Sequence, residues 1–558
     1  MSHPRSSSHS SSTLAVLNAS HLTHDRGGRP VLADVSLTVG PSSRIGVIGP
    51  NGVGKSTLLH LLAGLERPDR GTITVDPPGA TVGYLAQEHE RRDDETVRDA
   101  LARRTGVADA ERELMAAAND LATNTSSAND RYETALARYE SLGADTFDAR
   151  MATVLREFEL SADLATSATS TLSGGQEAKV ALAAIELSRF DVVLLDEPTN
   201  DLDFDGLARL EAWVHQRHGG TVIVSHDREF LERTVDTVLE IDEHARTARA
   251  FAGGWSGYQS ERANEERLAR ERFDEYQRTR EQLANRAQRQ RQWADVGVRK
   301  EVKNPRDHDK AQRDFRINRT ENLAHKARQT ERAMENLEVV DKPFEGWDLR
   351  FSIATAGRSG QDVVQLVAGV VTRGPFQLGP VDLEIAWGDR VAIVGVNGSG
   401  KSTLVSALLG TIALSSGTRR VGPSVVTGVL GQDRRALGAE HDLARYVQER
   451  SGLTIAETRT VLAKFGLGAE QVTRPTKSLS PGERTRAELA IFQARGVNFL
   501  VLDEPTNHLD LPAIEQLESA LRDFAGTLVL VTHDRRLLDA VAITRTIEVS
   551  DGVVTERH

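Results

Sequence analysis

Short apolar runs alternate with amphipathic segments along most of the chain, and the whole arrangement occurs twice. The runs Arg44–Ile48, Val192–Leu195 and Thr221–Val224 are uninterrupted, which is typical of strands buried on both faces. A similar run, Phe499–Leu502, lies in the second part of the chain. Each run ends in polar residues or glycines, as parallel strands do where they carry a site at their carboxyl ends. The pattern therefore predicts an α/β protein with two open sheets.

The segment 259–340, between the two repeats, has a different pattern. It is polar and charged, and it reads as two long antiparallel helices. Apolar or small residues recur at 4-3-4-3 spacing on the returning helix, which predicts a seam against the outgoing one. The seam residues are Leu323, Ala327, Thr330, Met334 and Leu337, facing Phe273, Tyr276 and Leu283. Gly297 and Pro305 predict that both helices break at a tip near 294–309.

A glycine-rich loop follows the first strand of each repeat and leads into a helix. The loops are Gly49–Thr57 and Gly395–Thr403, both of the form G-x-x-x-x-G-K-S-T. Strand, loop and helix in this order are the context that a phosphate-binding P-loop requires. In such a loop the backbone N–H groups close around the phosphates, and we expect Lys55 to reach the β- and γ-phosphates and Ser56 to bind Mg²⁺. A glycine turn before an ordinary core helix is the alternative, but the full pattern occurs twice.

Paired acids end a later strand of each repeat. Asp196 and Glu197 follow the first such strand, and Ser225-His226-Asp227 follows the next. Asp196 is predicted to hold Mg²⁺, Glu197 to orient the attacking water and His226 to contact the γ-phosphate. The second repeat has Asp503, Glu504 and His533 in the same roles. Both sites therefore carry the groups needed for hydrolysis.

The spacing of the motifs locates an insertion. Lys55 and Lys401 are 346 residues apart and Gln87 and Gln432 are 345 apart, whereas His226 and His533 are 307 apart. The first repeat therefore holds about 38 extra residues, which we place at about 106–145. This arm is predicted to be a helical hairpin, Ala108–Leu121 and Asp130–Ser141, with eight acidic and three basic residues. Its charge suits a protein partner better than a phosphate backbone, although a solvated hairpin without a partner is the alternative.

Composition adds one asymmetry. The formal charge is -12, yet residues 262–332 carry 20 basic and 13 acidic residues, so the rest of the chain has a net charge of -19. A basic segment on an otherwise acidic protein, here called the prong (262–332), predicts that this segment binds a polyanion such as structured RNA. The alternative is a solvated spacer whose charge has no partner. The absence of cysteine excludes disulfides and thiolate metal sites and fits a cytoplasmic protein. We expect no membrane segment and a disordered tail at 1–13.

These motifs, with Leu172-Ser-Gly-Gly-Gln176 and the runs Asp196–Asp203 and Asp503–Asp510, resemble those of ATP-binding-cassette ATPases. The arm in one repeat and the charged spacer are similar to the ABC-F family in particular. The resemblance implies two P-loop ATP-binding-cassette domains, 14–258 and 341–558, joined by an α-helical antiparallel hairpin linker, 259–340. It further implies a monomeric ATPase in which the cassettes close head to tail on two ATP molecules with Mg²⁺.

The resemblance assigns site residues on these motifs. The catalytic residues are Glu197, Glu504, His226 and His533. The nucleotide-binding residues are Gly49, Asn51, Gly52, Gly54, Lys55, Ser56, Thr57, Gly395, Asn397, Gly398, Gly400, Lys401, Ser402, Thr403, Ser173, Gly174, Gly175, Gln176, Ser480, Gly482 and Glu483. The metal-binding residues are Ser56, Gln87, Asp196, Ser402, Gln432 and Asp503.

Two departures from the family pattern are visible. The second signature is Leu479-Ser-Pro481-Gly-Glu483, and proline lacks the N–H that Gly174 keeps in the first. We therefore expect the Lys55/Ser480 and Lys401/Ser173 sites to turn over differently. The aromatic residue that usually stacks on adenine is also not evident. His24 is a candidate in the first repeat, and Arg373 or Phe376 in the second, so the choice between ATP and GTP stays open.

The resemblance also implies a partner. ABC-F linkers enter the ribosome, so rRNA and tRNA near the exit site and the peptidyl-transferase centre are the expected contacts of this prong. The RNA-contact candidates are Arg289, Arg291, Arg299, Lys300, Lys303, Arg306 and Arg313. We predict a translation factor or a ribosome-protection factor against macrolide- or lincosamide-type antibiotics. The energy-coupling subunit of a transporter with a separate permease, and a DNA-repair ATPase, are the alternatives; the second usually needs zinc-binding cysteines.

Overall fold

The structure is a computed structural model that describes residues 15–86, 95–121, 125–200, 202–303, 325, 328–337, 340, 360–431, 441–507 and 509–557. For residues 174 and 293–303 it describes the backbone alone. The chain divides into two compact units, Met1–Gly257 with Leu349–His558, and Tyr258–Asp348. We call 15–257 the first half, 360–557 the second half and Tyr258–Asp348 the linker. The expected tail at 1–13 lies outside the described residues.

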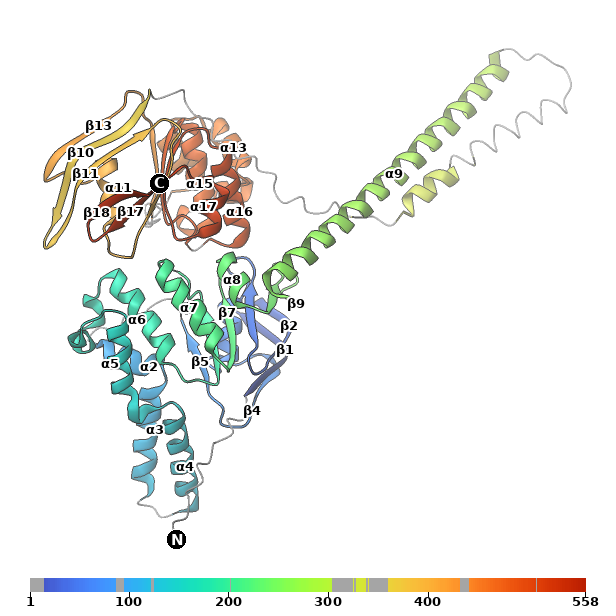
Figure 1. Ribbon diagram of the computed structural model, residues 1–558. Helices are drawn as coiled ribbons and strands as arrows, with labels where there is room; N and C mark the ends of the chain where they lie inside the picture. Colours follow the sequence, from blue (N-terminus) through green and yellow to red (C-terminus); the bar gives the residue numbers. More distant parts are fainter. Residues whose placement is uncertain are drawn as a thin grey trace, which may run out of the picture. The chain divides into compact units, whose positions relative to one another are not determined.

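A six-stranded sheet forms the centre of each half (Figure 1). In the first half the strand order is β5-β6-β7-β3-β8-β9, parallel except for the last strand. The strands are β3 (Arg44–Ile48), β5 (Val82–Leu85), β6 (Val192–Asp196), β7 (Gly220–Val224), β8 (Thr237–Ile241) and β9 (Ala248–Ala252). Every residue of β6 and β7 is buried, which explains their uninterrupted apolar runs.

The second half repeats this sheet with the order β14-β15-β16-β12-β17-β18. Its strands are β12 (Arg390–Val394), β14 (Thr427–Leu430), β15 (Phe499–Asp503), β16 (Thr527–Val531), β17 (Arg545–Ser550) and β18 (Val553–Arg557). Two repeated domains with parallel-rich sheets confirm the predicted α/β class.

A small antiparallel sheet accompanies each central sheet. In the first half its order is β2-β1-β4, and in the second β11-β10-β13. The strands are β1 (Val16–Arg26), β2 (Arg29–Val39), β4 (Arg70–Asp76), β10 (Asp362–Arg373), β11 (Phe376–Ala386) and β13 (Ser416–Val421). Side chains from β1, β2, the central sheet and the P-loop helix share one apolar core in the first half, which fixes the small sheet beside the P-loop.

The helices of the two halves correspond in order. Those of the first are α1 (Lys55–Leu62), α2 (Val97–Arg104), α3 (Val107–Asp120), α4 (Ser126–Ser141), α5 (Phe147–Glu157), α6 (Gly174–Leu187), α7 (Phe204–Gln216) and α8 (Arg228–Thr234). Those of the second are α11 (Lys401–Leu409), α12 (Leu443–Ser451), α13 (Ile455–Lys464), α14 (Ala469–Val472), α15 (Pro481–Ala494), α16 (Leu511–Asp523) and α17 (Arg535–Ala540). Helices α3 and α4 have no counterpart among the described residues of the second half.

Helices α3 and α4 form the arm expected at 106–145, and they lie side by side (Figure 1). Ion pairs join them at Arg138–Glu113, 2.8 Å apart, and at Arg131–Asp120. Helix α4 begins at Ser126, four residues before the predicted start, because Thr125 caps it by accepting a hydrogen bond from the Ala128 N–H. Residues 126–129, which the sequence predicted to lie before the second helix, are therefore helical.

One long helix, α9 (Gly254–Lys303), begins at the end of the first half and forms most of the described linker, followed by a returning helical segment at 328–335. The predicted break at Gly297 is wrong, because α9 runs through it. One glycine costs about 1 kcal/mol in a helix interior, which is too little to interrupt a helix of this length. The predicted tip at 294–309 is therefore helical as far as Lys303, and Pro305 lies outside the described residues.

The returning segment packs against α9 through a partly polar seam. Thr330 is buried and donates a 3.0 Å hydrogen bond to the amide oxygen of Gln290, and Ala287 is also buried. Met334 and Leu337 are half-buried, in keeping with the expected spacing, and Arg291 pairs with Glu331. The predicted seam residues Phe273, Tyr276 and Leu283 are half-buried, whereas Leu323 and Ala327 lie outside the described residues.

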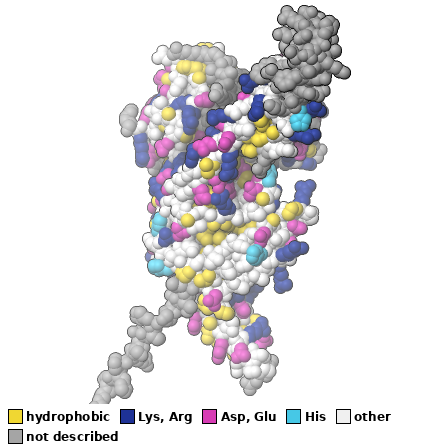
Figure 2. Space-filling model, turned by 90° about the vertical axis from the view of Figure 1, so that its right-hand side faces the viewer, with side chains coloured by type: hydrophobic (Ala, Val, Ile, Leu, Met, Phe, Trp, Pro, Cys, Tyr) yellow, Lys and Arg dark blue, Asp and Glu magenta, His cyan; other side chains and the backbone are white. Residues whose placement is uncertain are grey.

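Two surface properties bear on partners. Among the described residues no helix is both long enough and apolar enough to cross a membrane. On the face drawn in Figure 2, basic and acidic side chains are interspersed over the described part of the molecule. Neither sign of charge dominates there.

Candidate functional site

Each P-loop places a buried lysine over its own backbone. Lys55 Nζ lies 2.7 Å from the Gly49 carbonyl oxygen, and Lys401 Nζ lies 2.6 Å from that of Gly395. Burial lowers the pKa of both lysines, while nearby carboxylates, including Glu197 and Glu504, act to raise it. Each loop therefore holds a desolvated amine at the carboxyl end of a central strand, where a phosphate would meet it.

The last glycine of each loop is required by two constraints. Gly54 caps α1 with a φ of +114°, and a Cβ there would lie 2.7 Å from Val31 Cγ1. Gly400 has a φ of +112°, and its Cβ would lie 2.7 Å from Phe376 Cζ. A side chain would thus be strained and would also collide with the neighbouring strand. Only glycine lets the loop approach the small sheet this closely.

In the first half, Glu197, which is expected to orient the attacking water, lies beside His226, which is expected to contact the γ-phosphate. Glu197 Oε1 is 3.1 Å from His226 Nε2, and the two side chains are about 10% exposed. Burial raises the pKa of Glu197 to about 7, and burial also lowers that of His226 well below its ordinary value. Glu197 adopts a left-handed φ of 49°, a strained backbone for a side chain other than glycine. Such strain is concentrated at functional sites.

The second half repeats this arrangement with a longer distance between the acid and the histidine. Glu504 Oε1 lies 3.5 Å from His533 Nε2, and Glu504 has a φ of 46°. Burial lowers the pKa of His533 to about 4, so the imidazole is neutral at physiological pH. A neutral histidine beside a carboxylate suits a group that donates one hydrogen bond without carrying charge.

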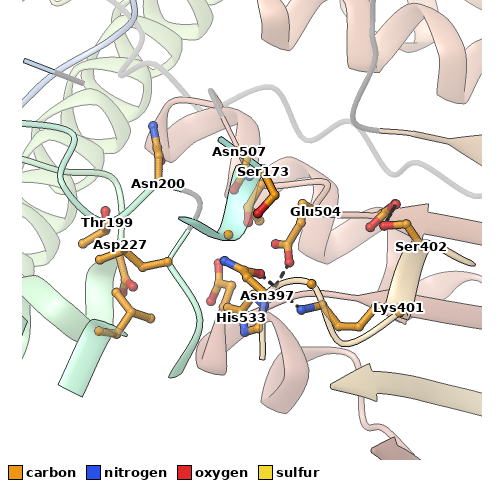
Figure 3. Close-up of a pocket in the computed structure, with 18 of the residues that line it drawn as sticks. Ser173, Thr199, Asn200, Asp227, Asn397, Lys401, Ser402, Glu504, Asn507 and His533 are labelled. Atoms are coloured by element: carbon orange, nitrogen blue, oxygen red, sulfur yellow. Dashed lines mark hydrogen bonds and ion pairs between the residues drawn. The ribbon is translucent and has the colours of Figure 1, made fainter. Parts of the chain in front are cut away.

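Residues of both halves line one cavity of about 660 Å³ (Figure 3). Its second-half lining includes the P-loop, the paired acids and the histidine: Asn397, Gly398, Gly400, Lys401, Ser402, Thr403, Asp503, Glu504 and His533. The first half contributes Ser173 and Gly175 of its signature, together with Asn200, His226 and Asp227. Figure 3 shows Ser173 on the same side of the cavity as Glu504 and Asn507. Arg373 and Phe376, the candidates for base contact, also line the cavity, whereas His24 lies 3.4 Å from Glu66 and from Asp69.

Reciprocal hydrogen bonds join the halves at the P-loops. The Asn397 N–H donates to Asp203 Oδ2 at 3.0 Å, and the Asn51 N–H donates to Asp510 Oδ2 at 3.1 Å. The aspartates end the two repeated runs after the paired acids, 307 residues apart. The sequence predicts no site role for them, although their repetition at one constant offset is a signal for one.

The two signature serines begin helices. Ser173 caps α6 and Ser480 caps α15, each in a capping box with the side chain three residues later. Gln176 Oε1 accepts from the Ser173 N–H at 3.0 Å, and Glu483 Oε2 accepts from the Ser480 N–H at 2.8 Å. Gln176 and Glu483 thus hold the caps, and their contact with nucleotide stays a prediction. Pro481 occupies the first turn of α15, where a missing N–H costs the helix nothing.

Among the described residues, those assigned to Mg²⁺ have the side chains that this ion prefers. Ser402 Oγ lies 3.4 Å from Asp503 Oδ2, and Asp196 is buried at the end of β6. A hydroxyl and one carboxylate are the hard oxygen ligands that Mg²⁺ takes alongside phosphate oxygens. No cluster of three or more histidine, cysteine or acidic side chains suited to a metal occurs in the described part of the chain. Nucleotide phosphate oxygens and the predicted ligands Gln87 and Gln432 would supply further oxygens to an ion here.

Several predicted residues cannot be placed. Gln87, Gln432, Arg306 and Arg313 lie outside the described residues, and the side chains of Arg299, Lys300 and Lys303 are not described. Of the RNA-contact candidates, Arg289 and Arg291 are exposed on α9. Their partner stays a prediction.

Comparison with known proteins decides the family. The ABC transporter family matches residues 32–200 and 378–507, more than half of the chain. The chain belongs to this family, and within it to the ABC-F group. This ABC-F protein is 36% identical to the tylosin resistance ATP-binding protein TlrC of Streptomyces fradiae, over 94% of this chain and 96% of the relative.

Two other relatives carry different names. The energy-dependent translational throttle protein EttA of Mycobacterium tuberculosis is 30% identical, over 92% of the ABC-F chain and 88% of its own. The putative ATP-binding protein YdiF of Bacillus subtilis is 31% identical, over 97% and 81%. A solved archaeal ribosome recycling factor, aABCE1, has 18% identity with a TM-score of 0.54, covering 96% of this chain and 89% of that one, which supports the fold alone.

Proposed function

We propose that this ABC-F protein hydrolyses ATP at two composite sites. Lys401, Ser402, Asp503 and Glu504 would act with Ser173 of the other half, and the first-half set would act with Ser480. The cavity shared by Lys401 and Ser173 is the observation that carries this proposal. Mg²⁺, when bound, would neutralise the charge on the β- and γ-phosphates.

The residues of the site would divide the work of hydrolysis. The P-loop amides and Lys401 would position the phosphates, and Glu504 would accept a proton from the attacking water. His533, neutral and 3.5 Å from Glu504, would keep that carboxylate aimed at the water. Closure of the halves would exclude bulk water, which strengthens each of these interactions.

A pairing test separates composite sites from independent ones. In a Glu197→Gln background the remaining turnover comes from the Glu504 site, so Ser173→Ala should slow it strongly. Ser480→Ala should have little effect in that background, and the pattern should invert with Glu504→Gln. If each serine affects the glutamate of its own half, the cross-half pairing is refuted. Comparison of the two single glutamine variants also tests whether Pro481 makes the sites unequal.

We propose further that the ribosome is the partner of the linker. The support is the basic excess of 262–332 and the names of relatives matched over more than nine-tenths of this chain, one a translational throttle and one a tylosin-resistance protein. Arginines on a helix suit the phosphate-rich, shape-based recognition of folded RNA. Such a partner would place the protein in the cytoplasm. A transporter ATPase has no evident use for this linker.

A charge test addresses the linker directly. Replacement of Arg289 and Arg291 with glutamine should weaken co-sedimentation with ribosomes and reduce its dependence on salt, because fewer counterions are released. Arg272 and Arg278, also exposed on α9 but nearer its start, are matched controls. Equal losses from both pairs would mean that general charge, rather than the distal linker, drives binding. An increase in the tylosin concentration tolerated by cells that express the protein would assign it to resistance; unchanged tolerance would favour a translation factor.

A further inference from the structure

A chain of polar contacts reaches the metal-site carboxylate of the first half from outside the P-loop. The Tyr84 hydroxyl, on β5, donates to Asp196 Oδ2 at 3.0 Å. His60 Nε2, on α1, lies 3.1 Å from the Tyr84 oxygen, and the two rings meet edge to face with centroids 4.9 Å apart. Glu66 Oε1 lies 3.1 Å from the other nitrogen of His60. Asp196 is buried, so these contacts restrict how its carboxylate turns.

At the equivalent positions of the second half, all of which the structure describes, this chain of contacts is missing. Strand pairing matches Tyr84 with Val429, because Tyr84 lies opposite Leu194 of β6 and Val429 lies opposite Val501 of β15. The position 346 residues after His60 is Ser406, and that after Glu66 is Ile412. None of the three can continue such a chain of contacts to the carboxylate from these positions.

Asp503 is instead oriented from within its own site. Its Oδ2 lies 3.4 Å from the hydroxyl of Ser402, the P-loop serine proposed to bind Mg²⁺. An arriving ion competes with that contact in the second half. In the first half, the carboxylate of Asp196 is held by Tyr84, which is not one of the residues assigned to the metal. The hydrogen bond from Tyr84 can therefore persist when an ion binds.

We infer that Tyr84 is a positioning residue that holds Asp196 for the divalent metal of the first nucleotide site. Its hydroxyl donates to Oδ2, and Oδ1 would remain available to hold the ion. His60, in contact with Glu66, fixes the tyrosine ring in turn. Partners behind a metal ligand typically change metal affinity about 10- to 100-fold when removed. The inference rests on the proposed metal role of Asp196, and it makes the two sites different in metal binding.

The test measures metal affinity at one site of the full chain. Lys401→Ala removes nucleotide binding at the second site, and Glu197→Gln stops turnover at the first. In this background, with ATP present, Mn²⁺ replaces Mg²⁺ and its binding is followed by electron paramagnetic resonance. Tyr84→Phe keeps the ring and removes only the hydroxyl. We expect the half-saturating Mn²⁺ concentration to rise about tenfold, while ATP binding in EDTA stays unchanged.

A mirror background provides the control. With Lys55→Ala and Glu504→Gln, Mn²⁺ reports the second site, and Tyr84→Phe should leave its affinity unchanged. An equal shift in both backgrounds would mean general destabilisation, and no shift in either would mean that the ring only packs; both overturn the inference. If the parent first-site background binds no Mn²⁺ with ATP, the metal role of Asp196 itself fails.

Discussion

A buried ion pair between the halves offers a quantitative test of how they hold together. Arg228 on α8 pairs with Glu518 on α16, with Nη1 3.2 Å from Oε2 and a second, closer contact between Nη2 and Oε1. The two side chains are 9% and 10% exposed. Burial opposes the charged guanidinium, but the hydrogen bond and charge of Glu518 outweigh it, so the pKa of Arg228 is raised. Glu518→Gln removes this partner and leaves the cation buried.

The expected cost follows from that burial. Removal of one partner of a buried pair costs about 3–5 kcal/mol. The charge of Asp534 also favours the cation of Arg228, so we expect the lower end, about 3 kcal/mol. That energy corresponds to about a 100-fold shift away from the closed arrangement of the halves. The equivalent pair, Arg535–Glu211 at 3.2 Å, is more exposed, and its loss should cost about 1 kcal/mol.

The assay uses the absence of native cysteine. Thr153→Cys and Thr460→Cys place one label on each half at matching exposed positions of α5 and α13. Energy transfer between the labels, measured against ATP concentration, gives the closed fraction. A double-mutant cycle of Glu518→Gln and Arg228→Met then isolates the coupling between the two side chains. A coupling below about 0.5 kcal/mol would refute the view that this pair stabilises closure.

Three further outcomes are expected. Gly54→Ala should abolish ATP binding and cost about 1–3 kcal/mol in thermal unfolding, whereas Gly52→Ala, with no atom near its Cβ, should cost less; equal costs would contradict the steric argument. Burial raises the pKa of Asp227 to about 6, above the value near 4 that it has in the unfolded chain. Protonated Asp227 therefore stabilises the fold most below pH 4, and this contribution is lost as the pH rises through about 6. The difference in free energy of unfolding between Asp227→Asn and wild type should therefore shift in favour of the variant by about 1–3 kcal/mol from pH 4 to pH 7. A difference that does not change with pH would refute the burial effect. Arg291→Gln should destabilise the linker by less than about 1 kcal/mol, because its pair with Glu331 is exposed on the arginine side; a larger loss of α9 helicity on heating would contradict this.

Strong local patterns predicted much of the fold. The P-loops, the strand-end acids and their constant offsets located both halves, because each motif needs its residues at fixed spacing along the chain. The arm was also visible, since a gap in register must be an insertion. The prediction of a break at Gly297 was wrong, because the continuity of a helix depends on the whole segment and not on one residue.

Contacts between distant positions were less accessible. The hydrogen bond from Tyr84 to Asp196 joins residues 112 apart, and neither residue predicts it alone. The Asp203–Asn397 contact likewise depends on how the halves meet. The capping role of Gln176 could have been anticipated, because Ser173 stands three residues before it at the start of a helix. Local contacts such as this cap can be predicted from the sequence, whereas contacts between the two halves cannot.

The most direct test of nucleotide-driven ribosome binding uses the double variant Glu197→Gln/Glu504→Gln. This protein should bind ATP, close its halves and fail to reopen, because neither site can activate water. Its co-sedimentation with ribosomes should exceed that of wild type several-fold in ATP and fall to the wild-type level in ADP. Equal sedimentation of the two proteins in ATP would contradict the account.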